Sequence, residues 1–149
     1  MGGEPYWYYV KYEADINAAL QKLRALEFKA GRYTPVIQFP SKLFPLGPNS
    51  PAPGAKHASI EAALQASGES GSRSILDLYR VAATPDFGAV RPMSEKVLMN
   101  IYGTTRPTRK MVEDNMEFLE DVDRGQGVYI IFYKDDKPDG ICFAGYSFD

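Results

Sequence analysis

The chain has 149 residues, the length of one domain, and its 44% hydrophobic and 24% charged residues are typical of a soluble globular protein. The single cysteine, Cys142, excludes an internal disulfide framework, and no stretch approaches the roughly 18–20 apolar residues that a membrane span needs. With no secretion signal at the start, the sequence predicts a cytoplasmic protein that does not associate with membranes.

Charge is distributed unevenly along the chain. Residues 1–112 contain 14 Lys and Arg against 9 Asp and Glu, whereas residues 113–149 contain 3 against 10. Such asymmetry can mark a surface for a charged partner, but we expect the two parts to neutralise each other within the fold. An isoelectric point near 5.5 argues against a nucleic-acid partner, because non-specific binding of nucleic acid needs a net basic surface.

The N-terminal segment predicts a strand and then a helix. Residues 5–12, PYWYYVKY, are rich in residues that favour strands, and alternation places Tyr6 and Tyr8 on the same face. Asp15 is a typical N-cap for a helix over residues 16–29, which has apolar residues at helical spacing and ends at the next glycine.

The next segment is rich in proline. Six of the eleven prolines lie between residues 35 and 53, where they remove hydrogen-bond donors and disfavour helix. We predict a short edge strand over 36–39 and a long loop over 40–55 that is internal to the domain. A loop of this length is often a lid or a binding loop. Ser59 then caps a short helix over residues 60–66.

Residues 73–83, RSILDLYRVAA, have an ambiguous pattern. Their apolar residues fit both alternation and helical spacing, and Ser74 with Asp77 matches a helix capping box. The flanking Gly, Ser and Thr-Pro residues favour a strand. Further on, Ser94 caps a helix over 95–102, and a longer helix is predicted from Pro107 or Thr108 to about Val122.

The C-terminal residues 127–148 predict a hairpin. Two aromatic-rich runs flank residues 135–140, which contain Pro and Gly. With Lys134 opposite Ile141, Phe132 would pair with Phe143. Neither face is polar along its middle, so we expect both faces to be covered.

These elements predict a single α+β domain over residues 1–149. Strands and helices are mixed without regular β-α-β alternation, which favours a mainly antiparallel sheet of about four strands, with helices packed on one face and a long Pro-rich loop.

No catalytic set or metal site is evident in the sequence. His57 is the only histidine and is best explained as a surface or capping residue, and Cys142, inside a predicted strand, as an inert core thiol. Asp135, Asp139 and Gly140 resemble a calcium loop superficially, but Lys137 and Tyr146 stand where ligands are required. We therefore predict no metal, no cofactor and no catalytic residue.

The helix predicted from residue 107 has its charges reversed, with basic residues at its start and acidic residues at its end. The helix dipole favours the opposite arrangement, so the pattern indicates either binding or compensation by the rest of the domain. The residues of a hypothetical anion site are Thr104, Thr105, Arg106, Thr108, Arg109 and Lys110. The residues of a hypothetical partner surface are Glu113, Glu117, Glu120 and Asp121.

Two functions follow as hypotheses. The first is a small binding or regulatory module that acts through a protein partner or through self-association as a homodimer. The alternative is a small enzyme or anion-binding domain with a pocket near the Pro-rich loop and the helix start at 104–110. In that alternative His57 and Arg73 line the pocket together with Arg106 and Arg109. A deep pocket favours the alternative, and a flat apolar or acidic patch favours the binding module.

Overall fold

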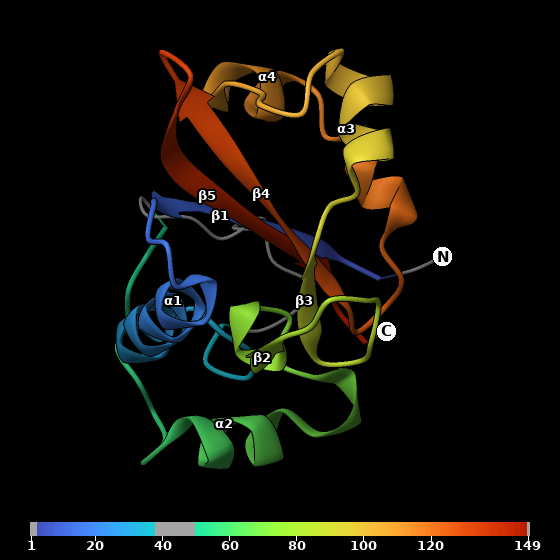
Figure 1. Ribbon diagram of the computed structural model, residues 1–149. Coiled ribbons are helices and arrows are strands. Elements are labelled where there is room, and N and C mark those ends of the chain that lie inside the picture. Colours follow the sequence, from blue (N-terminus) through green and yellow to red (C-terminus); the bar gives the residue numbers. More distant parts are fainter. Residues whose placement is uncertain (1–2, 38–49, 149) are drawn as a thin grey trace.

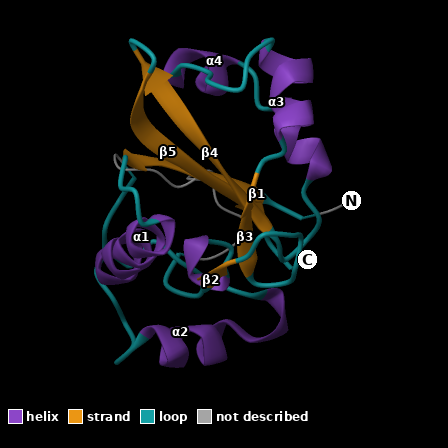
Figure 2. Cartoon of the chain, in the orientation of Figure 1, coloured by secondary structure: helices purple, strands orange, loops and turns teal. Residues whose placement is uncertain are grey.

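The computed structural model describes residues 3–37 and 50–148, which form one mixed sheet with helices on both faces (Figure 1, Figure 2). Within the described residues the sheet has five strands in the order β1-β5-β4-β3-β2. The strands are β1 (Pro5–Lys11), β2 (Arg80–Val81), β3 (Ala89–Pro92), β4 (Gly127–Lys134) and β5 (Lys137–Tyr146). The α-helices are α1 (Ile16–Ala30), α2 (Ile60–Ser67), α3 (Glu95–Tyr102) and α4 (Arg109–Asp114), and the 3-10 helices are η1 (Gly68–Ser70), η2 (Ile75–Asp77) and η3 (Glu117–Asp121).

The α+β class is confirmed, but the expectation of about four, mainly antiparallel strands is wrong. β1 and β4 both pair antiparallel with β5, whereas β2 pairs parallel with β3 and β3 parallel with β4. Between β3 and β4 the chain passes through α3, α4 and η3. Such a long crossover allows a parallel pair, which a short turn cannot connect.

Helices cover both faces of the sheet, so the expectation that they pack on one face is wrong. One core lies between the sheet and α3, α4 and η3, and the other between the sheet and α1 with η2 (Figure 1). Both sides of the central strands are apolar, and each therefore needs cover. The first core contains Leu98, Val112, Phe118, Val128, Ile130, Phe132, Cys142 and Ala144. The second contains Tyr6, Tyr8, Leu20, Leu23, Ile75, Leu78, Ile141 and Phe143.

The hairpin is present, but its predicted register is wrong. Its turn consists of Asp135 and Asp136, both at positive φ, 52° and 63°, as a tight two-residue hairpin turn requires. Lys134 pairs with Lys137, so residues 137–139, expected in the loop, belong to β5. A register shift between Phe132 and Tyr133 then pairs Phe132 with Gly140 instead of the expected Phe143.

Several locally encoded elements are confirmed. The predicted strand over 5–12 is β1. The Asp15 side chain accepts a hydrogen bond from the Ala18 amide at the start of α1, and Gly31 ends this helix in the left-handed conformation. Ser59 and Ser94 cap α2 and α3 in the same way. In each case the cap satisfies amides that have no partner inside the helix.

The long helix predicted to reach Val122 is interrupted at Asn115. The Tyr102 hydroxyl donates a hydrogen bond of 2.6 Å to the Asn115 carbonyl, and the Asn115 side chain accepts one of 3.0 Å from the Glu117 amide. These bonds replace the helical ones, and the backbone of Asn115 is extended. The predicted helix is therefore two short pieces, α4 and η3.

The strand favoured over residues 73–83 is mostly wrong. Its first half forms η2, which is capped by Ser74, and the strand β2 contains only Arg80 and Val81. Within the edge strand predicted over 36–39, residues 36 and 37 lie in a turn and the other two lie outside the described residues. Residues 50–55 have no regular secondary structure, and 40–49 lie outside the described residues, so the long loop stays a prediction.

Replacing Gly140 by Ala tests the packing of the hairpin. A Cβ at this position would overlap the Phe132 ring and would lie 2.7 Å from the Val10 carbonyl oxygen. We expect Gly140→Ala to lower the free energy of unfolding by about 2 kcal/mol, because a crowded core must shift backbone and ring together. Urea unfolding measures the change. Asp139→Ala, at the exposed neighbouring position, is the control, and equal stability of the two variants would contradict this packing.

Candidate functional site

Two large aromatic side chains, Tyr79 and Phe87, lie half exposed beside the short strand β2. Their exposed fractions are 50% and 53%. Each ring packs against a glycine that leaves no room for a Cβ, Tyr79 against Gly88 and Phe87 against Gly125. Phe87 also contacts Phe148, with the ring centroids 4.8 Å apart. We call Tyr79 and Phe87 the aromatic face; both rings are held on one side and open to solvent on the other.

The loop that carries Phe87 is held at both ends by backbone hydrogen bonds. The Tyr79 amide donates to the Gly88 carbonyl at 2.9 Å, and the Gly88 amide donates to the Gly125 carbonyl at 2.8 Å. An ion pair between Arg80 and Asp86 spans the loop. The hydrogen bond from Arg80 lowers the pKa of the Asp86 carboxyl, which keeps the pair charged at neutral pH.

An acidic stretch, Glu117, Glu120, Asp121 and Asp123, lies next to the aromatic face. The Arg91 side chain donates a hydrogen bond of 2.7 Å to the Asp121 carbonyl and so ties η3 to β3. Figure 1 shows this stretch, in orange, above the loop between β2 and β3 on the same side of the molecule. The four side chains are exposed, and within residues 3–37 and 50–148 none of them forms an ion pair.

A cavity of about 510 Å³ opens beside the acidic stretch. Its walls combine apolar side chains with two carboxylates of the stretch and one basic side chain. The lining residues are Gly3, Pro5, Leu119, Glu120, Val122, Asp123, Arg124 and Tyr146. Such a site suits an apolar side chain that ends in a positive charge.

Three of the four residues of the predicted partner surface lie in the acidic stretch, and the fourth does not. Glu113 lies on α4 and pairs with Arg109 at 3.4 Å. Asp123, an acidic residue at the end of the predicted helix that was not included in the predicted partner surface, continues the same acidic run. Tyr79 and Phe87 were missed because aromatic residues are usually buried, and no local pattern shows which of them stay exposed.

The basic residues of the hypothetical anion site have partners within the chain. Lys110 and Asp114 form an ion pair of 3.1 Å, and Arg106 pairs with Asp136 at 2.9 Å. The Arg109 guanidinium lies 4.9 Å from the centroid of the Tyr9 ring. Carboxylates and aromatic rings of the same domain therefore compensate the basic charges at this end.

The threonines of that hypothetical site have local roles. The Thr108 hydroxyl accepts a hydrogen bond from the Met111 amide as the N-cap of α4, and the Thr104 hydroxyl accepts one from the Arg106 amide. Thr105 lines a small cavity together with Arg106. The six residues thus stay together at one end of the sheet, in a turn and the first part of a short helix.

A cluster of buried polar residues surrounds η2. Asp77 is 3% exposed, and its Oδ1 atom accepts hydrogen bonds of 2.8 Å from both the amide and the hydroxyl of Ser72. Arg73, beside it, is buried and has a left-handed φ of 52°. Burial raises the pKa of Asp77 to about 6, although the hydrogen bonds from Ser72 oppose this shift.

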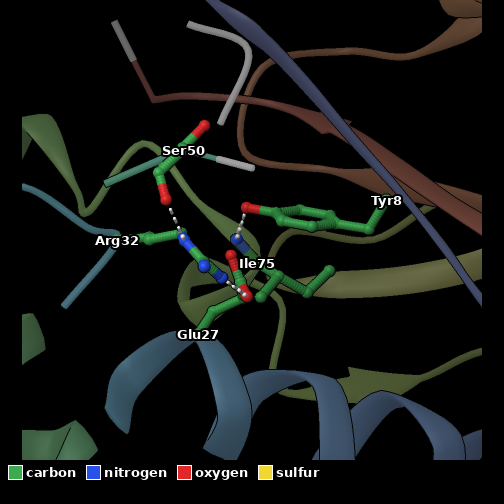
Figure 3. A network of polar contacts seen from close by, with 5 residues as sticks. All are labelled: Tyr8, Glu27, Arg32, Ser50 and Ile75. Atoms are coloured by element: carbon green, nitrogen blue, oxygen red, sulfur yellow. Dashed lines mark hydrogen bonds and ion pairs between the residues drawn. The ribbon is translucent and has the colours of Figure 1, made fainter. Parts of the chain in front are cut away.

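A second buried carboxylate, Glu27, lies near this cluster at the end of α1. It forms an ion pair of 2.8 Å with Arg32, which also donates to the Ser50 carbonyl at 3.4 Å (Figure 3). Burial raises the pKa of Glu27, and the Arg32 charge partly reverses the shift. The Tyr8 hydroxyl in the same view accepts a hydrogen bond from the Ile75 amide. Perturbed carboxylates such as these occur at functional sites and in structural networks alike.

His57 and Cys142 do not form a catalytic pair. The Nδ1 atom of His57 lies 2.8 Å from the hydroxyl of the fully buried Tyr33, whose neighbour Thr34 bonds to the Ser72 carbonyl. Cys142 is buried in the core beneath α3 and α4. Burial raises the pKa of its thiol to about 12, so the sulfur stays protonated and unreactive.

Among the residues described, no group of three or more His, Cys, Asp and Glu is placed to hold a metal ion. None of the described helices has both the length and the apolar character to cross a membrane. Comparison with known proteins finds no matching family model, no matching curated protein and no matching solved structure.

The raised pKa of Asp77 predicts a specific pH dependence of stability. Because its pKa in the folded state, about 6, exceeds the ordinary value of 3.8, Asp77 contributes stability when protonated, and this contribution is lost as the pH rises through 6. The free energy of unfolding of Asp77→Asn, relative to that of wild type, should therefore rise by about 2 kcal/mol between pH 4 and pH 7. Urea unfolding of both proteins across this range measures the difference. A difference that stays constant with pH would contradict the assignment.

Proposed function

We propose that the protein is a binding module for a protein partner that carries basic residues. The surface consists of the aromatic face and the acidic stretch. The observation that carries the proposal is that Tyr79 and Phe87 are half exposed and yet packed against glycines. Exposed aromatic side chains are enriched among residues that dominate binding energy, and a side chain already held in place loses little entropy on binding.

The acidic stretch supports a basic partner. Its four carboxylates are exposed and have no ion-pair partner among the described residues, so an incoming Lys or Arg replaces no ion pair within that part of the chain. Charges at the rim of an interface mainly increase the rate of association and select among partners. Self-association through the same surface is disfavoured, because it would bring two acidic stretches together.

The alternative of a small enzyme has less support. His57 and Arg73 lie in a region of buried polar residues, but His57 bonds to a buried tyrosine and the only thiol is buried and protonated. A nucleophile must reach the substrate, and the buried thiol lacks that access, while Nδ1 of the half-buried His57 is taken up by the Tyr33 hydroxyl.

Replacing the aromatic face tests the proposal. Tagged wild-type protein and the double variant Tyr79→Ser/Phe87→Ser are used to capture partners from the native lysate, with quantification by mass spectrometry. We expect wild type to capture a basic protein. The captured amount should be at least about tenfold lower with the variant, since interface residues of this kind contribute roughly 2 kcal/mol or more to binding.

The matched control is Leu26→Ser/Met99→Ser, which removes two other exposed apolar side chains, 60% and 50% exposed. It should capture the partner as wild type does, and circular dichroism should show that all proteins stay folded. Equal capture by both double variants would contradict the proposal. If sedimentation shows a homodimer that the Tyr79→Ser/Phe87→Ser change dissociates, the surface serves self-association and the proposal of a separate protein partner is wrong.

Charge reversal tests the acidic stretch separately. Glu117→Lys/Glu120→Lys should slow association with the captured partner at least about tenfold at low salt and should weaken the dependence of the rate on salt, because steering depends on these charges. Surface plasmon resonance at several salt concentrations measures both effects. Glu61→Lys/Glu69→Lys, on α2 and η1, changes the net charge equally and should have a much smaller effect. Equal effects of the two pairs would show that only net charge matters.

A further inference from the structure

The outer edge of β4 has a gap in its hydrogen bonding. β3 pairs with β4 only as far as Tyr129, whose carbonyl accepts a hydrogen bond of 3.0 Å from the Met93 amide. Further along, the Tyr133 amide donates to the Pro107 carbonyl at 2.8 Å. Alternate residues of a strand direct their backbone groups to the same edge. Ile131 therefore directs its N–H and C=O groups to this edge, where no described residue bonds to them.

A cavity of about 360 Å³ lies at this gap. Its lining includes Ile130, which faces the core under α3 and α4, and Ile131, which faces the other core. Side chains from both faces of the sheet meet only at its edge, so the backbone of Ile131 forms part of the cavity wall. We call this cavity the β4 notch. Its polar and charged lining residues are Thr105, Arg106 and Glu95.

Arg106 supplies a positive charge that a ligand can use. Its guanidinium lies 5.4 Å from the centroid of the Tyr133 ring and 2.9 Å from an Asp136 carboxylate oxygen. The side chains of Arg106 and Asp136 are 54% and 77% exposed, so their ion pair contributes little. A ligand carboxylate can therefore take the place of Asp136, with the two parallel hydrogen bonds that a guanidinium offers.

We infer that the β4 notch binds a small molecule that carries an amide next to a terminal carboxylate, of the size of an N-acylated dipeptide. The amide matches the N–H and C=O of Ile131, to which no described residue bonds, and the carboxylate matches Arg106. A long strand cannot pair along this edge, because Tyr129 and Tyr133 on either side are already bonded within the chain. The ligand is therefore a free small molecule or the last residues of another chain.

Titration with N-acetyl-dialanine tests the inference. We expect binding with a Kd of about 1 mM, since a ligand of this size gains a limited affinity per atom. In nuclear magnetic resonance spectra of the wild-type protein, the amide signals of Ile131 and Thr105 should shift. The same probe with its C-terminus amidated should bind at least tenfold more weakly.

Variants separate the role of the charge from that of the fold. Arg106→Gln should weaken binding at least tenfold, whereas Asp136→Asn should strengthen it, because a competing carboxylate is removed. The matched control is Arg80→Gln, since Arg80 is likewise exposed, paired with an aspartate and placed over a tyrosine ring; it should bind as wild type does. A purely structural role of Arg106 would not make the Asp136 variant bind more tightly.

A peptide of ten residues that ends in dialanine distinguishes the two sources of the ligand. Binding as tight as that of the short probe would show that the notch accepts a chain terminus, and loss of binding would restrict it to free small molecules. Absence of any shift at Ile131 with both probes, or equal binding of the amidated probe, would overturn the inference.

Discussion

The paired strands β4 and β5 are the constraint on which the rest of the structure depends. β5 lies between β1 and β4, and the residues of this ladder contribute to both cores. Small residues make the close packing possible. A Cβ at Gly145 would lie 2.9 Å from the Tyr6 hydroxyl and 3.0 Å from Leu78 Cδ1, and one at Gly127 would overlap Leu78. The two glycines therefore fix how closely η2 and β1 approach the hairpin.

The shortness of β2 and β3 produces the surfaces that matter for binding. Because β3 ends at Pro92, the outer edge of β4 has no described partner at Ile131, and the β4 notch forms there. Because β2 has two residues, the chain turns back at once, and the loop brings Phe87 onto Gly125 next to η3. The proposed protein surface and the inferred small-molecule site share no residue, so each can be disrupted without the other.

The two ends of the segment that follows α3 differ in whether their charged side chains have ion-pair partners. The basic side chains at the start each have an exposed ion-pair partner, Asp114, Glu113 or Asp136, whereas the acidic end has no described ion-pair partner. The buried carboxylates of Glu27 and Asp77 are a separate case. Oε1 of Glu27 and Oδ2 of Asp77 accept no hydrogen bond from the described residues, so their burial opposes folding at neutral pH. The apolar contacts of the two cores must offset this cost.

The sequence by itself determined the elements whose signals are local: β1, α1, α2 and α3, with their caps at Asp15, Ser59 and Ser94, and the existence of the hairpin. A helix cap or an alternating run of residues is encoded within a few neighbouring positions, so it can be predicted without knowledge of the fold. Only the tertiary structure decided the register of the hairpin, the break at Asn115, the parallel pairing of β3 with β4 and the exposure of Tyr79 and Phe87. Each of these depends on a contact between distant residues, such as that of Tyr102 with Asn115, and such contacts leave no local pattern. The candidate sites follow the same division, since the acidic stretch was predicted in part from its charges, whereas the aromatic face and the β4 notch exist only in the folded chain.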